Sequence, residues 1–278
     1  SMYKKIIEIL SERPNVFDQE NEYWKSEELM EMNLKIELDE DNSFGSRGEL
    51  FGKKSVKWIS KLLNEETKNK SVLDLGCGTG VIAREFYEAG FDVTGVDISI
   101  IALKYARSMN KNINYIYGDY FEINFNRTFD IIYLGYCALG MYNKQKRYEL
   151  IKKCYNHLND GGLLILDVFS KYKFSNFCDY KIWEIDMEKN QWATSPYLHF
   201  LNFIVYPEDN TYLDRHIIFK DSVLKIYNRW NHVFDINELR DSLNHCGFTK
   251  LDFYNDICGL PYAKGGDTIC VIAHKYLS

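Results

Sequence analysis

The sequence is poor in the features that mark secreted, membrane-bound or metal-stabilised proteins. Its seven cysteines are odd in number, and they include no Cys-x-x-Cys pair and no His/Cys cluster at metal-ligand spacing. This pattern argues against a disulfide framework and against a structural zinc site. No apolar run is long enough to span a bilayer, and the first residues contain no signal-peptide core. We therefore expect a cytoplasmic protein with reduced thiols, no bound metal and no membrane partner.

Proline is also scarce, and the chain has no net positive charge. Only four prolines occur in 278 residues, and no Pro/Gly-rich linker separates one half of the chain from the other. The formal net charge is −6 and the pI is about 5.6, so the chain lacks the basic field that usually drives affinity for phosphate backbones. We expect no nucleic-acid partner and a monomer or homodimer.

What is present is a regular alternation of apolar runs and helical patterns. Residues 1–69 are charged and helical in pattern, whereas residues 70–169 alternate short apolar strands with helices. Strands that are apolar on both faces are typical of a parallel sheet covered by helices on both sides. Strands are expected at 72–75, 91–96, 113–117, 129–134 and 163–168, with helices near 81–87, 99–109 and 144–158.

The alternation is interrupted between residues 170 and 233. This stretch is rich in aromatic and β-branched residues with period-two patterning, which predicts an antiparallel β insertion. A capping-box pattern at Asp235–Glu238 then begins another helix, and strands at 248–254 and 268–274 follow. The predicted organisation is an N-terminal helical cap (1–69), a core (70–169 and 234–278) and a β insertion (170–233) that covers the substrate site.

A glycine-rich loop follows the first expected strand. The segment Val72–Gly80 reads VLDLGCGTG, and its glycines permit a close approach of ligand to backbone N–H groups at a helix N-terminus. Asp97 ends the second strand, where a carboxylate can accept the hydroxyls of a ribose. A dinucleotide site is disfavoured because Asp74 would repel a diphosphate, whereas a ligand with an ammonium and a sulfonium suits that acid.

Five segments in this order resemble the successive motifs of class I S-adenosylmethionine (SAM)-dependent methyltransferases, of the bacterial small-molecule type. They are DLGCGTG, VTGVDIS, YGDY, FDIIYLGY and GGLLILDVF, and the resemblance covers residues 71–170. The resemblance implies a Rossmann-like α/β fold with a doubly wound, seven-stranded, mostly parallel sheet whose last strand is reversed. It also implies that SAM is the cofactor, S-adenosylhomocysteine (SAH) the product and a small molecule the methyl acceptor.

The resemblance further implies positions for the cofactor. The amino-acid end of SAM is expected near Asp74, Gly76, Cys77, Gly78 and Gly80; the ribose and adenine near Asp97, Ile98, Asp119 and Tyr120; and the methylthio group near Leu134, Gly135 and Tyr136. Arg47 is a candidate partner for the SAM carboxylate, because a guanidinium can bind it in bidentate fashion. A surface arginine that caps a turn is the alternative interpretation of Arg47.

Candidates for the acceptor site lie in the two capping segments. Aromatic and charged side chains of these segments could line it, namely Tyr23, Trp24, Tyr197, His199, Arg215 and Trp230. Tyr136, His199 and His232 are candidate general bases, although structural roles are the ordinary alternative for each of them.

The accepting atom is left open between nitrogen, oxygen and sulfur. The segment after the fourth strand reads GYCA and lacks the Asn/Asp-Pro-Pro-aromatic tetrapeptide of enzymes that methylate amino groups of nucleobases or glutamine. Competing hypotheses are an RNA or protein methyltransferase, a non-catalytic SAM-binding protein, and transfer of an alkyl group other than methyl.

Overall fold

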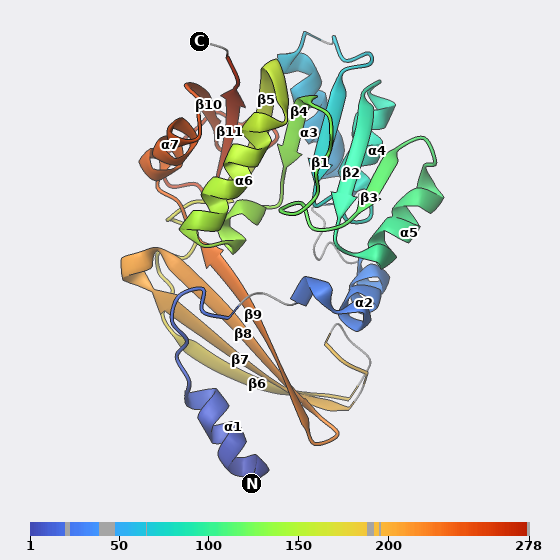
Figure 1. Ribbon diagram of the computed structural model, residues 1–278. Coiled ribbons are helices and arrows are strands. Elements are labelled where there is room, and N and C mark those ends of the chain that lie inside the picture. Colours follow the sequence, from blue (N-terminus) through green and yellow to red (C-terminus); the bar gives the residue numbers. More distant parts are fainter. Residues whose placement is uncertain (20–22, 39–47, 65, 188–191, 195, 277–278) are drawn as a thin grey trace.

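The computed structural model describes residues 1–19, 23–38, 48–64, 66–187, 192–194 and 196–276. Two sheets dominate it, a seven-stranded sheet in the upper part of Figure 1 and a four-stranded sheet below it. The helices are α1 (Met2–Ser11), α2 (Glu27–Leu38), α3 (Gly48–Leu62), α4 (Val81–Glu88), α5 (Ile100–Met109), α6 (Lys144–Asn156) and α7 (Ile236–His245). Three short 3-10 helices are η1 (Tyr23–Lys25), η2 (Ala138–Met141) and η3 (Pro207–Asp209).

The larger sheet has the strand order β10-β11-β5-β4-β1-β2-β3. Its strands are β1 (Ser71–Leu75), β2 (Asp92–Asp97), β3 (Asn114–Tyr117), β4 (Phe129–Leu134), β5 (Leu158–Phe169), β10 (Lys250–Tyr254) and β11 (Thr268–His274). Neighbouring strands are parallel except that β11 is antiparallel to both β5 and β10. The predicted doubly wound sheet with a reversed last strand is therefore confirmed.

Helices cover both faces of this sheet. Leu150 of α6 and Leu239 of α7 belong to the apolar cluster on one face. On the other face, side chains of α3, α4 and α5, among them Ile59, Phe86 and Leu103, form a second cluster. Every residue of β1 is buried, as expected for a strand between two helical layers.

Local signals in the sequence explain where several helices begin. The Ser99 hydroxyl accepts the Ala102 N–H at 3.2 Å, and the Asn143 side chain accepts the Lys146 N–H at 2.9 Å. Asp235 caps α7 by accepting the Asn237 N–H at 2.8 Å. The expected capping box is incomplete, because the Glu238 carboxylate binds His232, the last residue of β9, at 2.6 Å.

The four-stranded sheet is antiparallel throughout and falls within the predicted insertion. Its strands are β6 (Tyr180–Asp186), β7 (Tyr197–Tyr206), β8 (Thr211–Lys220) and β9 (Val223–His232). Residues that pair directly across the ladder share a face, so the register assigns two faces. We call the face that carries Asp214, His216 and Arg229 the inner face, and the one that carries Arg215, Asn228 and Trp230 the outer face.

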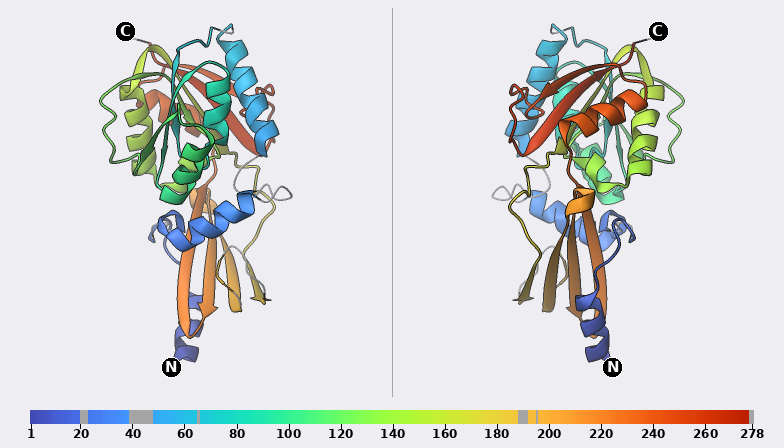
Figure 2. Two further views of the ribbon diagram at one scale, coloured as in Figure 1. Left: turned by 90° about the vertical axis from the view of Figure 1, so that its right-hand side faces the viewer. Right: turned by 90° about the vertical axis from the view of Figure 1, so that its left-hand side faces the viewer.

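The N-terminal segment divides between three places. The C-terminal end of α1 lies against the outer face, where the Leu10 carbonyl accepts a hydrogen bond from Asn202 at 3.2 Å. Helix α2 lies between the four-stranded sheet and α5, as Figures 1 and 2 show. Helix α3 packs on α4 as part of the core. Residues 1–69 were expected to form a cap, but α3 lies outside any cap.

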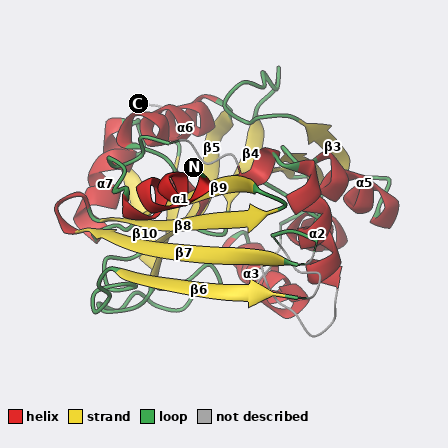
Figure 3. Cartoon of the chain, turned by 90° about the horizontal axis from the view of Figure 1, so that it is seen from below, coloured by secondary structure: helices red, strands yellow, loops and turns green. Residues whose placement is uncertain are grey.

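The carboxyl ends of the parallel strands point toward the four-stranded sheet (Figure 1). Seen from below, the four strands spread across this end of the molecule, with α2 at one side (Figure 3). Ligands of open α/β sheets bind at the carboxyl ends of the strands, at the point where the strand order reverses. Here that point lies between β1 and β4. No helix in the described ranges is both long and apolar enough to cross a membrane.

Candidate functional site

The glycine loop joins β1 to α4 in a conformation that only glycine adopts easily. Gly76, Gly78 and Gly80 have φ values of 73°, 53° and 82°. A Cβ at Gly80 would collide with the Tyr115 hydroxyl, whereas a Cβ at Gly78 would meet nothing within 4 Å. The loop is therefore packed on one side and open at Gly78, as a ligand-binding loop requires.

Asp97 ties this loop to the end of β2. Its two carboxylate oxygens accept the backbone N–H groups of Gly78 and Ser99, each at 2.8 Å. Each oxygen keeps a second lone pair, so the carboxylate can still accept hydroxyl groups such as those of a ribose. Burial raises the pKa of Asp97, although the backbone N–H groups oppose that shift.

Asp74 is a buried carboxylate without a partner at one oxygen. The residue is 3% exposed, and its Oδ2 atom has no hydrogen bond within the part of the chain that the structure describes. Burial, and then the charge of Asp97, raises its pKa to about 8. An unpaired acid at this position fits a ligand that brings its own positive charge, as the ammonium group of SAM does.

The residues expected near adenine lie at the ends of β2 and β3. The Asp119 carboxylate accepts the Phe121 N–H at 2.9 Å, which fixes the turn after β3. The Tyr120 hydroxyl is hydrogen-bonded to the Tyr142 hydroxyl, and its ring lies 3.9 Å from the position of a Cβ on Gly76. Ile98 is half-buried directly after Asp97. The structure thus brings the Tyr120 ring beside the glycine loop, with Asp119 next to it in the turn after β3.

The turn after β4 is held in an unfavourable backbone conformation. Tyr136 and Cys137 have φ values of 58° and 56°, in the left-handed region that non-glycine residues rarely adopt. The Asp167 carboxylate of β5 accepts the Cys137 N–H at 3.0 Å and is fully buried. Leu134 is buried as well, and the Tyr133 ring leaves no room for a Cβ at Gly135. Asp167 is a supporting residue that the sequence analysis did not single out, although an acid within an apolar strand was its signal.

His199 is fully engaged on the inner face. Its Nδ1 atom lies 2.8 Å from Glu184 Oε1, and its Nε2 atom lies 2.9 Å from His216 Nδ1. The Trp192 ring stacks on His216 with the centroids 4.2 Å apart. Burial, Arg229 and His199 lower the pKa of His216 to about 3, which keeps this ring neutral.

His232 is engaged at both ring nitrogens too. Its Nδ1 atom lies 3.1 Å from the Thr211 hydroxyl, and its Nε2 atom lies 2.6 Å from Glu238. Arg147 lies 3.7 Å from the same carboxylate of Glu238. The histidine therefore links the four-stranded sheet to α7, and neither ring nitrogen is free to take a proton from a substrate.

Aromatic candidates from the N-terminal segment gather on the inner face. Tyr23 is 1% exposed and contacts Trp24, Trp192 and Tyr227, with ring centroids 4.7, 5.5 and 6.3 Å away. Trp24 Nε1 is buried without a hydrogen bond to any described residue. The Tyr197 hydroxyl of β7 donates to Asp186 at 2.8 Å. These rings join α2 to the sheet.

Arg215 and Trp230 lie on the outer face, away from the other candidates. The Arg215 side chain is fully buried, where it pairs with Glu12 at 2.5 Å and donates to Gln19 at 3.0 Å. Trp230 donates to the Gln19 carbonyl at 2.9 Å and packs on Phe17. Both expected substrate contacts are therefore occupied by the N-terminal segment. Arg47 lies outside the described residues.

Glu37 of α2 reaches the glycine loop, although no sequence pattern singled it out. Thr79 of that loop lowers the pKa of the Glu37 carboxyl group. Burial first, and then the charge of Asp97, raises its pKa to about 7. A distant helix contributes this acid, so only the tertiary structure could reveal it.

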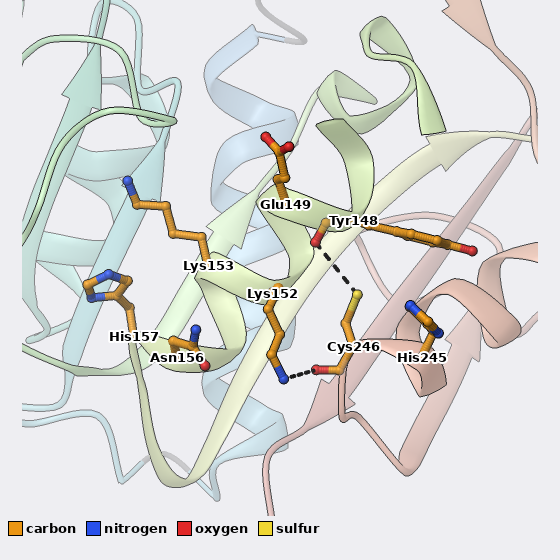
Figure 4. Close-up of a pocket in the computed structure, with 8 residues that line it drawn as sticks. All are labelled: Tyr148, Glu149, Lys152, Lys153, Asn156, His157, His245 and Cys246. Carbon is orange, nitrogen blue, oxygen red and sulfur yellow. Dashed lines mark hydrogen bonds between the residues drawn. The ribbon is translucent and has the colours of Figure 1, made fainter. Parts of the chain in front are cut away.

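A surface hollow lies elsewhere, between α6 and the C-terminal end of α7 (Figure 4). It measures about 570 Å³, and its lining includes Lys152, His245 and Cys246. Two of these are joined, since Lys152 donates to the Cys246 carbonyl at 3.4 Å. None of the motif residues lines this hollow, so it is separate from the glycine loop.

Comparison with known proteins agrees with the motifs. Residues 72–162 match a family described as a methyltransferase domain. A predicted methyltransferase of Geobacillus sp. (strain WCH70) is 26% identical over 249 residues, which cover 78% of this chain and 97% of that protein.

Solved structures agree with the fold. A SAM-dependent methyltransferase from Clostridium acetobutylicum superposes with a TM-score of 0.62 at 19% identity, covering 81% of this chain and 92% of the other. The sugar N-methyltransferase KedS8 of Streptoalloteichus sp. superposes with a TM-score of 0.58 at 13% identity, covering 96% and 98%. The matched domain and the shared fold, with the glycine loop, Asp74 and Asp97 in place, support a SAM-dependent methyltransferase.

Proposed function

We propose that this enzyme transfers a methyl group from SAM to a small molecule held between the carboxyl ends of the parallel strands and the inner face of the four-stranded sheet. The observation that carries the proposal is the placement of that face opposite the cofactor loop, with α2 at its side (Figure 1). When bound, SAM supplies an electrophilic methyl group on a sulfonium. The protein must hold the acceptor in line with it and exclude water.

The inner face offers charge of both signs for a polar acceptor. Asp214 and Arg229 pair across β8 and β9 without a close ion pair, and burial raises the pKa of Asp214. Asp214 makes no side-chain hydrogen bond to any residue that the structure describes. Arg229 lies over the Tyr23 ring, 5.4 Å from its centroid. We propose Asp214 and Arg229 as acceptor contacts in place of Arg215 and Trp230.

Nitrogen is the accepting atom that we favour. A half-buried carboxylate such as Asp214 attracts an amine and can hold it as its proton is lost. The similarity to KedS8, a sugar N-methyltransferase, supports an amine-bearing small molecule of comparable polarity. Oxygen and sulfur acceptors are the alternatives.

Tyr136 is the proposed group for handling the proton of the acceptor. His199 and His232 each use both ring nitrogens within the protein, so they are weaker candidates. Tyr136 lies directly after β4 in the turn that Asp167 supports. The left-handed backbone of Tyr136 suggests that the residue is held there for its position in the site and not for core packing.

The proposal is tested by incubating the protein with SAM and separate panels of small amines, amino sugars, phenols and thiols. Formation of SAH and of the methylated product is followed by mass spectrometry. We expect turnover with an amine, and a loss of about tenfold or more in kcat/KM for Asp214→Asn. Asp209→Asn, a change in η3, is the matched control and should retain activity. Turnover of a macromolecule but of no small molecule would contradict the proposal.

A further inference from the structure

The outer face of the four-stranded sheet becomes wholly apolar toward the turn between β8 and β9. The register places two rows of side chains there, and neither row contains a polar residue. At the β6 end of these rows, Trp183 is 67% and Ile185 is 61% exposed. Adjoining apolar side chains that remain exposed in this way mark an interaction surface. The two apolar rows are Trp183–Phe200–Ile217–Ile226 and Ile185–Leu198–Phe219–Leu224.

The N-terminal segment is anchored on the next row of the outer face. That row is polar, and it consists of Asn202, Arg215 and Asn228. Glu12 pairs with Arg215 at 2.5 Å, and the Gln19 side chain accepts a hydrogen bond from Asn228 at 2.6 Å. These polar contacts end where the two apolar rows begin.

Helix α1 extends from this anchor and has an apolar side that the chain leaves open. None of the residues Met2–Ser11 is buried, and the side chains of Tyr3 and Ile7 are exposed. Figures 1 and 2 show that the helix projects beyond the body of the molecule. Because so short a helix depends on packing for its stability, α1 and the apolar rows both require an apolar partner.

The charge of the outer face favours a second copy of the chain as that partner. On the outer face of the four described strands, Lys181 and Arg215 are the only lysine, arginine or acidic residues, and Arg215 is buried against Glu12. In a twofold contact a face meets its own copy, so a charge near the axis would oppose itself. An uncharged face suits that contact, whereas it lacks the cluster of basic side chains that binds nucleic acid or anionic lipid.

The size of the patch also fits a dimer. A large apolar side chain that is mostly exposed offers on the order of 100 Å². The exposed residues of α1 and β6, with the half-buried side chains of the two rows, therefore offer roughly 600 Å². A standard interface takes about 800 Å² from each partner, and polar atoms at the rim can supply the remainder.

We propose that the chain forms a homodimer through α1 and the two apolar rows of the outer face. Sheets that pack face to face lie about 10 Å apart, and in this dimer α1 of each copy closes one side of the contact. The interface is independent of the proposed acceptor site, because it uses the opposite face of the four-stranded sheet.

The test is sedimentation velocity of the full chain from about 1 to about 100 μM, for the wild type, Ile185→Glu and Ile182→Glu. Ile182 is the matched control, since it is the same residue type in the same strand, is 51% exposed, and lies on the inner face. We expect the wild type to sediment with twice the chain mass of 32.8 kDa.

The two isoleucine variants should then differ. Ile185→Glu should raise the Kd of the dimer at least about tenfold, because each copy would bring a charge into an apolar contact. Ile182→Glu should leave that Kd unchanged. Ile7→Glu should weaken the dimer as Ile185→Glu does, since it places a charge on α1. Circular dichroism of each variant shows that the fold is intact.

Four results would overturn the proposal. A wild type that stays monomeric at about 100 μM would exclude a stable dimer. Equal weakening by Ile185→Glu and Ile182→Glu would place the contact at the free edge of β6 instead of on the outer face. A dimer that Ile185→Glu does not weaken would have its interface elsewhere. A monomer that sediments with phosphatidylcholine vesicles would assign the apolar rows to a membrane surface.

Discussion

The Asp97 carboxylate accepts the Gly78 N–H at 2.8 Å, so the acid that ends β2 also fixes the glycine loop after β1. Two motifs that are separate in the sequence are thereby one structural unit. Any ligand that binds Asp97 also meets the open side of the loop at Gly78. This coupling explains why the site depends on both strands.

SAM affinity should rise with pH through about 7 to about 8. The pKa values of Glu37 and Asp74 are raised to about 7 and about 8 in the free protein, chiefly by burial. A cationic ligand favours their ionised forms, so binding releases protons below these pKa values and the affinity falls as the pH is lowered. Titration calorimetry in buffers of different ionisation enthalpy, from about pH 6 to about pH 9, measures the released protons. Proton uptake on binding would contradict this account.

Asp74→Asn should stabilise the free protein at high pH while it weakens SAM binding. The pKa of Asp74 is raised from 3.8 in the unfolded chain to about 8 in the folded protein. Between these pH values the folded protein holds a proton at Asp74 that the unfolded chain has lost. The buried Asp74 therefore destabilises the fold increasingly as the pH rises from about 4 to about 8. Asparagine does not titrate. We expect a gain of a few degrees in Tm at about pH 9 and a smaller one at about pH 5. The same Tm difference between Asp74→Asn and the wild type at both pH values would be inconsistent with a raised pKa of Asp74.

Arg215 should matter for stability and not for the cofactor. Arg215→Met leaves Glu12 without its buried partner and removes the bonds to Gln19 and Asn228, so we expect a loss of about 3 kcal/mol in the free energy of unfolding. Urea denaturation measures it. Arg13→Ala removes an ion pair with Asp179 whose side chains are 50% and 52% exposed, and should cost less than about 1 kcal/mol. A tenfold loss of SAM affinity in Arg215→Met would instead place Arg215 near the site.

Gly80→Ala separates backbone strain from steric collision. Gly80 and Gly161 have φ values of 82° and 77°, but only the added Cβ at Gly80 meets neighbouring atoms, chiefly the Tyr115 hydroxyl. We expect Gly161→Ala to cost about 1 kcal/mol and Gly80→Ala about 1–3 kcal/mol more, together with weaker SAM binding. Adding Tyr115→Phe should recover part of the loss at Gly80. Equal costs for the two glycine substitutions would show that the loop can move away from Tyr115.

The core of the fold was predictable because each strand and several helix starts had a local signal. Each of these signals involves only a few neighbouring residues, as in the apolar run at Val72–Leu75, the cap at Ser99 and the glycine loop. The hydrogen bond from the Cys137 N–H to the Asp167 carboxylate could not be predicted from local sequence, since it joins the turn after β4 to β5. Its motif had been identified, but the role of the acid within it had not.

The capping segments were predictable only in outline. Alternation in the insertion predicted strands, and the register then decided which face each side chain occupies. Arg215 and Asp214 lie on opposite faces, but the sequence could not show that the N-terminal segment covers the face of Arg215. Glu37 was missed for the same reason, because its contact with Thr79 depends on how α2 packs on α5.

The most direct test of the central claim is titration calorimetry of SAM into the wild-type protein and into Asp97→Ala at equal temperature and salt. The account predicts binding in the micromolar range for the wild type. It also predicts a loss of at least about thirtyfold for the variant, since removing a charged hydrogen-bond acceptor costs about 2 kcal/mol or more. Absence of SAM binding to folded wild-type protein, or equal binding by Asp97→Ala, would contradict the assignment of the cofactor site.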